Sequence, residues 1–211
     1  MNAQTETFNE FIIRTPSSDD IPALVDVINA DALKYLGAPD ITVEEYQAEW
    51  NEPGMERTNI TRIATTLQGQ AVALVEAHSW PPHVRNFLWG RVHPDYVDRG
   101  LGTYLTQWGE AYVREQMALA PIDARVTVAT SVIRTNLAAA TLFQDLGYRH
   151  ARSFYTMAIE MESPPPAPIW PEGVYVRTMQ PGEEADVYRA IDDAFRDHWG
   201  HVDTPFEESF P

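Results

Sequence analysis

Two glycines one residue apart, Gly100 and Gly102, stand where an amphipathic helix is expected to begin, and Arg99 precedes them. The first-turn amides of a helix have no partner inside the helix, and the helix dipole places positive potential there. An anion with several oxygens can bind those amides if no Cβ atom blocks its approach to the backbone. The spacing therefore predicts a phosphate or pyrophosphate site formed by residues 97–103.

Two other phosphate-binding motifs do not fit this loop. A dinucleotide fingerprint requires a third glycine three residues after Gly102, where this chain has Leu105. A P-loop requires a lysine directly after its last glycine, and the one lysine of the chain is Lys34. A glycine turn that only caps a core helix stays open as an alternative.

The predicted loop needs a strand before it and a helix after it. The stretch RNFLWGRV at 85–92 is typical of that strand, and apolar residues at 101, 104, 105, 108 and 112 fall on one helical face. The same periodicities predict further strands at 11–15, 60–67, 70–78, 124–132 and 149–162, and helices at 21–36, 42–50 and 135–148. Thr42 and Glu45 form a capping-box pattern at the start of one of these helices.

Five prolines within SPPPAPIWPEG at 163–173 predict a semi-rigid linker. We therefore expect one domain at 1–162 and a second segment at 174–211. At an offset of 163 residues, Ile13-Arg14-Thr15 matches Val176-Arg177-Thr178, Leu24 matches Val187, and Ile28 matches Ile191. The second segment thus repeats the start of the first, although so short a repeat leaves chance similarity open.

Composition narrows the classes of function. The chain has 211 residues and a formal net charge of -16 at pH 7, which disfavours nucleic acid as a partner. An acidic surface favours a cationic substrate such as an amine, or serves solubility alone. The absence of cysteine excludes disulfides, thiolate metal sites and cysteine nucleophiles. Without a long apolar run or a signal-like N-terminus, we expect a cytoplasmic protein that does not bind membranes.

The strand ending Val92-His93-Pro94 and the six residues Val97-Asp98-Arg99-Gly100-Leu101-Gly102 resemble the phosphate-binding signature of the GCN5-related N-acetyltransferase (GNAT) superfamily. That signature usually begins with Gln or Arg, so Val97 departs from it. The order of the predicted elements from 11 to 162 also follows the family. The resemblance implies a GNAT fold of the α/β (α+β) class, with a mixed, mostly antiparallel sheet of about six to seven strands and about four helices. The repeat resembles the two-copy members, which include mycothiol synthase-like proteins, with an incomplete second copy.

The resemblance also implies acetyl-CoA as the acyl donor and direct attack by an amine in a ternary complex. The residues it assigns to the donor are Val92, Val97, Asp98, Arg99, Gly100, Leu101, Gly102, Thr103, Asn136 and Phe143. A backbone N–H of Arg91 or Val92 would polarise the thioester carbonyl at a bulge in the strand. Asn136 is explained equally well as the cap of its own helix.

The proton-transfer groups are less well defined. The family often has a tyrosine as general acid where this chain has Phe143, whose ring cannot donate a proton. Tyr148 is taken as the candidate in its place, with Tyr155 and solvent as alternatives. Glu76 on the strand 70–78 is the candidate general base, although a solvent-facing role stays open.

His78 and His93 are alternatives to Glu76 as the base, because an imidazole titrates near neutral pH. The histidines and acids show no metal-binding spacing, so no metal is expected.

We predict an N-acyltransferase that moves an acetyl group from acetyl-CoA to an amine on a small molecule or a protein. The alternative is a non-catalytic acyl-CoA-binding module or the regulatory half of a tandem protein, which Phe143 and the incomplete second copy favour. A third interpretation is a domain that binds another phosphate ligand. The sequence is also compatible with a homodimer.

Overall fold

The protein's structure is a computed structural model that describes residues 5–52 and 56–209. The chain divides into two compact units, residues 1–148 and 149–211. The first unit contains a six-stranded sheet whose strands lie in sequence order. The predicted mixed, mostly antiparallel sheet is therefore confirmed.

The sheet is antiparallel except at its last pair, β5 and β6, which run parallel. Its strands are β1 (Glu6–Phe8), β2 (Phe11–Arg14), β3 (Thr61–Thr66), β4 (Ala71–Ser79), β5 (Arg85–Val92) and β6 (Thr127–Thr130). β1 was not expected from the sequence, since only three residues form it. The remaining five strands lie within the predicted stretches, apart from one residue at the end of β4.

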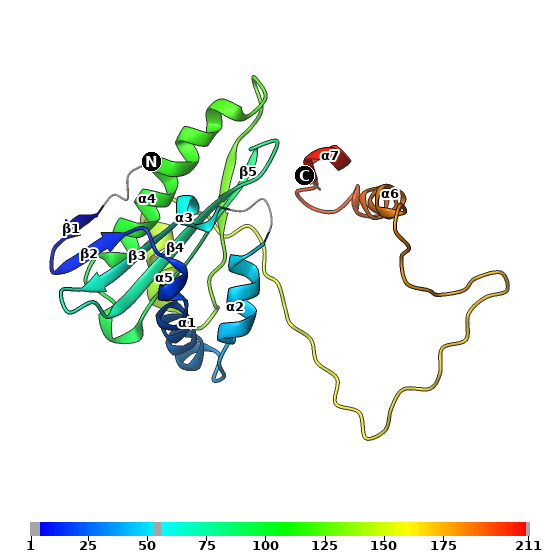
Figure 1. Ribbon diagram of the computed structural model, residues 1–211, viewed down its shortest axis with the longest axis horizontal. Coiled ribbons are helices and arrows are strands. Elements are labelled where there is room, and N and C mark those ends of the chain that lie inside the picture. The colour runs from blue at the N-terminus through cyan, green and yellow to red at the C-terminus, as the bar shows by residue number, and fades with distance from the viewer. Residues whose placement is uncertain (1–4, 53–55, 210–211) are drawn as a thin grey trace. The chain divides into compact units, whose positions relative to one another are not determined.

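Helices cover both faces of the sheet (Figure 1). One face packs against α1 (Ile21–Tyr35) and α2 (Val43–Trp50), and the other packs against α4 (Leu101–Gln116). The unit also contains α5 (Leu137–Asp145), the short α3 (Arg57–Ile60), and 3-10 turns at Ser18–Asp20, Pro94–Tyr96 and Met117–Leu119. Side-chain alternation along β4 sends Leu74 to the α1 side, and Ala73 and Val75 to the α4 side.

Local sequence explains where α2 and α4 begin. The capping box of α2 is present, since the Glu45 amide donates to Thr42 Oγ1 and the Thr42 amide donates to Glu45 Oε2. α4 begins directly after Gly100 and buries Leu101 and Leu105 against the sheet. Burying each of these leucines stabilises the fold by about 1.5–3 kcal/mol, which fixes the helix start against the sheet.

The closing strand predicted at 149–162 is wrong. None of its residues is in a strand, and Phe154, Tyr155, Met157, Ile159 and Met161 are all more than half exposed. A segment with alternating apolar residues forms a strand only if a neighbouring strand pairs with it. The described part of the second unit contains no strand that could do so. That unit contains the helices α6 (Glu184–Phe195) and α7 (Phe206–Ser209).

The sequence repeat recurs in local structure. Arg14 pairs with both carboxylate oxygens of Asp20 at 2.8 and 2.6 Å, and Arg177 pairs with both oxygens of Glu183 at 2.7 and 2.5 Å. In each copy the backbone amide three residues before the acid donates to it at 2.8 Å. The same arrangement of an arginine, an acid and a backbone amide therefore forms twice, although among the described residues only the first copy has a strand before it. The predicted boundaries at 162/163 and 173/174 lie inside the second unit and stay predictions.

Within the described residues, no helix is both long and apolar enough to cross a membrane. The predicted cytoplasmic location and homodimer stay predictions.

Candidate active site

The sheet opens between its last two strands. β5 and β6 are paired from Arg85 with Thr127 to Leu88 with Thr130, and from there to Val92 β5 is paired with β4 only. Residues 89–92 and 131–133 line a cavity of about 380 Å³. The parting of the two strands therefore creates a cavity within the sheet, next to the predicted phosphate loop.

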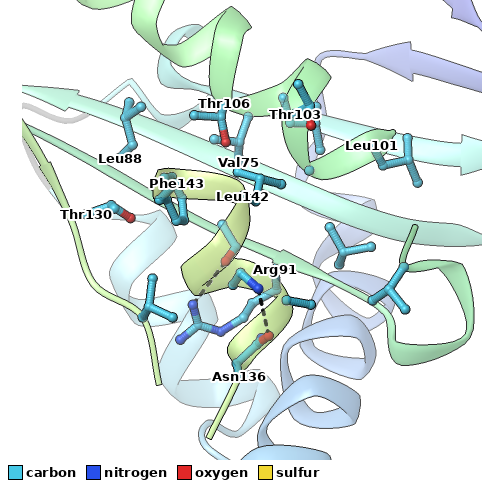
Figure 2. A pocket seen from close by; sticks show the side chains of 18 of the residues that line it. Val75, Leu88, Arg91, Leu101, Thr103, Thr106, Thr130, Asn136, Leu142 and Phe143 are labelled. Carbon is cyan, nitrogen blue, oxygen red and sulfur yellow. Dashed lines mark hydrogen bonds between the residues drawn. The ribbon is translucent and has the colours of Figure 1, made fainter. Parts of the chain in front are cut away.

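The cavity lining comes from both faces of the sheet. Leu88 and Val75 belong to the face that α4 covers, whereas Trp89 and Arg91 pair with Glu76 and Leu74 on the face that α1 covers. Figure 2 shows Leu142 and Phe143 of α5 projecting among Val75, Thr106 and Thr130. A ligand bound in the cavity would thus contact side chains from both faces of the sheet.

The start of α4 forms one end of this cavity. The lining there consists of Val97, Asp98, Gly100, Leu101, Gly102 and Thr103. As members of the first turn, the amides of Leu101, Gly102 and Thr103 have no acceptor inside the helix. These amides and the helix dipole make the end suitable for an anion, as the sequence predicts.

The structure adds packing reasons for the glycines. Gly100 has φ of 83°, and a Cβ there would lie 3.2 Å from Phe8 Cζ. A Cβ on Gly102 would lie 2.8 Å from Leu142 Cδ1, so this glycine also lets α4 and α5 approach closely. Gly90 is the tightest case, because its Cβ would lie 2.7 Å from the carbonyl oxygen of Leu74.

Arg99 does not line the cavity. Its Nη1 donates to Glu10 Oε1 at 2.9 Å, and its guanidinium lies over the Tyr96 ring. Its assignment to the donor stays a prediction, and the geometry gives it a part in holding the loop to the β1–β2 turn.

Arg91 lines the cavity and faces Asp31, a buried acid on α1 that the sequence analysis missed. Arg91 Nε lies 3.2 Å from Asp31 Oδ2, yet Nε is a buried nitrogen without a hydrogen-bond partner. The guanidinium donates instead through Nη1 to the carbonyl of Gly90 and lies over the Trp89 ring. Burial raises the pKa of Asp31, and the charges of Arg91 and Lys34 only partly oppose this.

Glu76, the predicted base, is buried and lies outside the cavity lining. Its carboxylate binds Tyr46 Oη at 2.7 Å, Arg57 Nη1 at 2.8 Å and His78 Nε2 at 3.0 Å. Burial alone would raise the pKa of Glu76, but the hydrogen bond from His78, the Arg57 charge and the Tyr46 hydroxyl together lower it. Its role as base stays a prediction, and its placement favours a structural role.

The two alternative bases also lie outside the lining. His78 belongs to the Glu76 cluster and stacks on Trp80 with ring centroids 4.9 Å apart. His93 Nδ1 accepts from the Asp95 amide at 3.2 Å and so caps the turn at 94–96.

The structure places Asn136 and Phe143 in the lining and Tyr148 behind them. Asn136 Oδ1 accepts from the Ala139 amide at 3.0 Å, so Asn136 caps α5 and also faces the cavity (Figure 2). Tyr148 packs edge-on against Phe143, and its hydroxyl is buried. Burial and the nearby Glu110 carboxylate raise the pKa of Tyr148, which keeps the hydroxyl neutral. Tyr155, the alternative, is an exposed residue of the second unit.

The absence of a bound metal stays a prediction. In the second unit, ligand atoms of Asp192, His201 and Asp203 lie within 4.8 Å of one another. His201 Nε2 already pairs with Asp192 at 3.4 Å and with Asp203 at 3.1 Å, which accounts for this grouping without an ion.

A sequence signal for Asp31 was available. Asp31 follows Leu24 by seven residues and Ile28 by three, so it lies on the same helical face, where an apolar residue is expected. A buried carboxylate costs free energy unless it is paired, so an acid on an apolar stripe calls for an explanation.

Comparison with known proteins gives a consistent result, although no family model matches the chain. A GCN5-related N-acetyltransferase from Sphaerobacter thermophilus is 34% identical with a TM-score of 0.79, covering 97% of this chain and 63% of that chain. A mycothiol acetyltransferase from Salinispora arenicola is 35% identical over 109 residues, covering 51% of this chain and 32% of the relative. The similarity thus extends over less than two thirds of either protein's length.

The fold also matches more distant solved structures. One is yncA, a putative acetyltransferase from Salmonella typhimurium solved with its cofactor acetyl-CoA. It is 16% identical with a TM-score of 0.52, covering 67% of this chain and 80% of that chain. At that identity the similarity supports the fold alone.

Proposed function

We propose that this chain, which belongs to the GCN5-related N-acetyltransferase superfamily, transfers an acetyl group from acetyl-CoA to an amine. The observation that carries the proposal is the start of α4, where Gly100 and Gly102 border a cavity between two parted strands. A helix N-terminus suits a pyrophosphate, and an unpaired strand edge suits an extended amide-bearing chain.

The residues present fit such a donor. The first-turn amides of residues 101–103, beside the loop residues 97, 98 and 100, would hold its pyrophosphate, while the edge of β5 at 89–92 that faces away from β4 would pair with its extended arm. Acetyl-CoA would supply a thioester whose carbonyl carbon is open to an amine. The backbone N–H of Val92, which faces away from β4, would stabilise negative charge that develops on the carbonyl oxygen.

The cavity's other features favour an amine as the acceptor. Away from the start of α4, its lining contains two carboxylates, those of Asp31 and Asp145, and one guanidinium, that of Arg91. This excess of acid attracts a cation. The acceptor is proposed as a small-molecule or protein amine.

A second candidate function is a module that binds acyl-CoA without catalysis. The observation that favours it is Phe143 in the lining, with the Tyr148 hydroxyl buried outside it. Such a site would hold the donor and lack a nearby tyrosine to protonate the leaving sulfur.

Calorimetry with coenzyme A and acetyl-CoA, followed by a thiol-release assay with a panel of amines, tests both candidates. We expect Gly102→Glu to weaken coenzyme A binding by at least about 100-fold, since a carboxylate at the start of α4 repels the pyrophosphate. The matched control is Gln107→Glu, which adds the same charge on the exposed side of α4.

Binding with thiol release supports the transferase, and binding without release supports the module. Absence of heat from coenzyme A and its acetyl form would overturn both, and equal affinity in the two variants would remove the α4 start from the site.

A further inference from the structure

One buried carboxylate in the cavity wall has no hydrogen-bond donor. Asp31 is 4% exposed and lines the cavity, yet among the described residues none donates a hydrogen bond to its carboxylate. Arg91 supplies charge at 3.2 Å without directing its N–H at the acid. A buried charge without donors is costly, so it is expected where a ligand provides them.

The sequence repeat does not include this acid. At the offset of 163 residues, the apolar positions Leu24 and Ile28 keep apolar counterparts in Val187 and Ile191. Asp31 has Ala194 as its counterpart. The scaffold positions are thus repeated, and the acid occurs only in the copy that has the glycine loop.

The position of Asp31 is suited to an acceptor rather than to the donor's phosphates. It comes from α1, on the opposite face of the sheet from α4, and the lining reaches it beside Trp89 and Arg91. Arg91 is held by the Gly90 carbonyl and the Trp89 ring, so it is fixed beside the carboxylate.

We propose that Asp31 binds the ammonium group of the acceptor and takes one proton from it, an inference that rests on the proposed function. Arg91 acts as a positioning residue that holds the carboxylate. The acceptor nitrogen loses two protons in the reaction. One passes to Asp31 and then to water, and the other ends on the sulfur that leaves as the new C–N bond replaces the C–S bond.

Binding of an amine to the protein saturated with coenzyme A tests this without catalysis. The probes are phenethylamine and n-butylamine, with phenethyl alcohol as the uncharged control. We expect Asp31→Asn to weaken amine binding by about 10- to 100-fold, the usual loss for a hydrogen bond between charged groups. Asp26→Asn on the exposed face of the same helix is the matched control, and thermal denaturation checks that each variant is folded.

Turnover provides the second readout. We expect Asp31→Asn to lower kcat/KM for the amine by about 100-fold or more, with KM for acetyl-CoA unchanged. The residual rate should rise about tenfold per pH unit, because only free amine reacts once the base is gone. The charged groups that face Asp31 are Arg91 on β5, Lys34 on α1 and Asp40 after α1.

The other results of these binding experiments would contradict the role of Asp31 or the proposed function. Equal amine affinity in Asp31→Asn and Asp26→Asn, or no amine binding by the wild-type protein, overturns the inference. A parallel loss of coenzyme A affinity would assign Asp31 to the donor and also overturn it. No heat from coenzyme A removes the proposed function instead, while Asp31-dependent amine binding would then still support the carboxylate as an ammonium site.

Discussion

Two buried carboxylates lie on the side of the sheet that α1 and α2 cover, and the protein holds them in opposite ways. Glu76 accepts hydrogen bonds from Tyr46, Arg57 and His78, and its pKa is lowered. Asp31 has only the charge of Arg91 beside it, and its pKa is raised. Burial is nearly the same, so the number of donors distinguishes a carboxylate that holds the fold from one that is available to a ligand.

The largest expected effect is on the stability of the fold at Glu76. We expect Glu76→Gln to lower the free energy of unfolding by about 3–5 kcal/mol, because the buried Arg57 charge is left with only the exposed Glu49 carboxylate, 3.7 Å away. Asp31→Asn should change it by no more than about 1 kcal/mol, since the surroundings of Asp31 disfavour its charge. Urea unfolding measures both, with Glu44→Gln on the exposed face of α2 as the control. Similar losses of unfolding free energy in Glu76→Gln and Asp31→Asn would contradict the distinction between the two carboxylates.

The next largest effect comes from removing one hydrogen-bond donor, the Tyr46 hydroxyl, from the Glu76 carboxylate. Tyr46→Phe removes one hydrogen bond to the Glu76 carboxylate and should cost about 1.5–3 kcal/mol, the usual value for a bond to a charged group. Tyr35→Phe, a change of the same size on α1, serves as the control. A loss no larger than that of the control would mean that Arg57 and His78 hold the carboxylate without the phenol.

The pH dependence of stability should have opposite signs at the two acids. The contribution of Glu76 is full above the unfolded pKa of about 4.3 and is lost as pH falls through its lower folded pKa. The contribution of Asp31 is full below the unfolded pKa of about 3.9 and is lost as pH rises through its higher folded pKa. Relative to wild type, Asp31→Asn should therefore gain stability as pH rises from about 3 to 7, and Glu76→Gln should lose it. Unfolding curves across that range check the signs, and parallel curves would contradict them.

The smallest effect concerns the repeat. Ala194 is exposed on α6, so Ala194→Asp should change stability by less than about 0.5 kcal/mol, as surface substitutions usually do. Thermal denaturation of this variant measures the change. A large loss would show that α6 buries this position as α1 buries Asp31.

The sequence predicted the parts of the fold that local chemistry decides. The glycine loop, the apolar stripe of α4 and the capping box at Thr42 and Glu45 each depend on residues a few positions apart. These features formed as expected because neighbours along the chain determine them.

Features that depend on distant residues could not be predicted from the sequence. Glu76 was expected either to face solvent or to serve a pocket, because a lone acid on a strand cannot reveal that Tyr46 and Arg57 will reach it. Arg99 was expected at the phosphate, and only the fold brings Glu10 to it. The stretch 149–162 alternates like a strand, but the pattern contains no information on whether a partner strand is present.

Gly90 limits how this cavity can be altered. A methyl group there would push β5 away from the Leu74 carbonyl and so shift Trp89 and Arg91 together. Side chains elsewhere in the wall, such as those of Thr130 on β6 and Phe143 on α5, do not take part in this contact between strands. A library aimed at changing what the cavity binds should therefore vary those positions and keep residue 90 fixed.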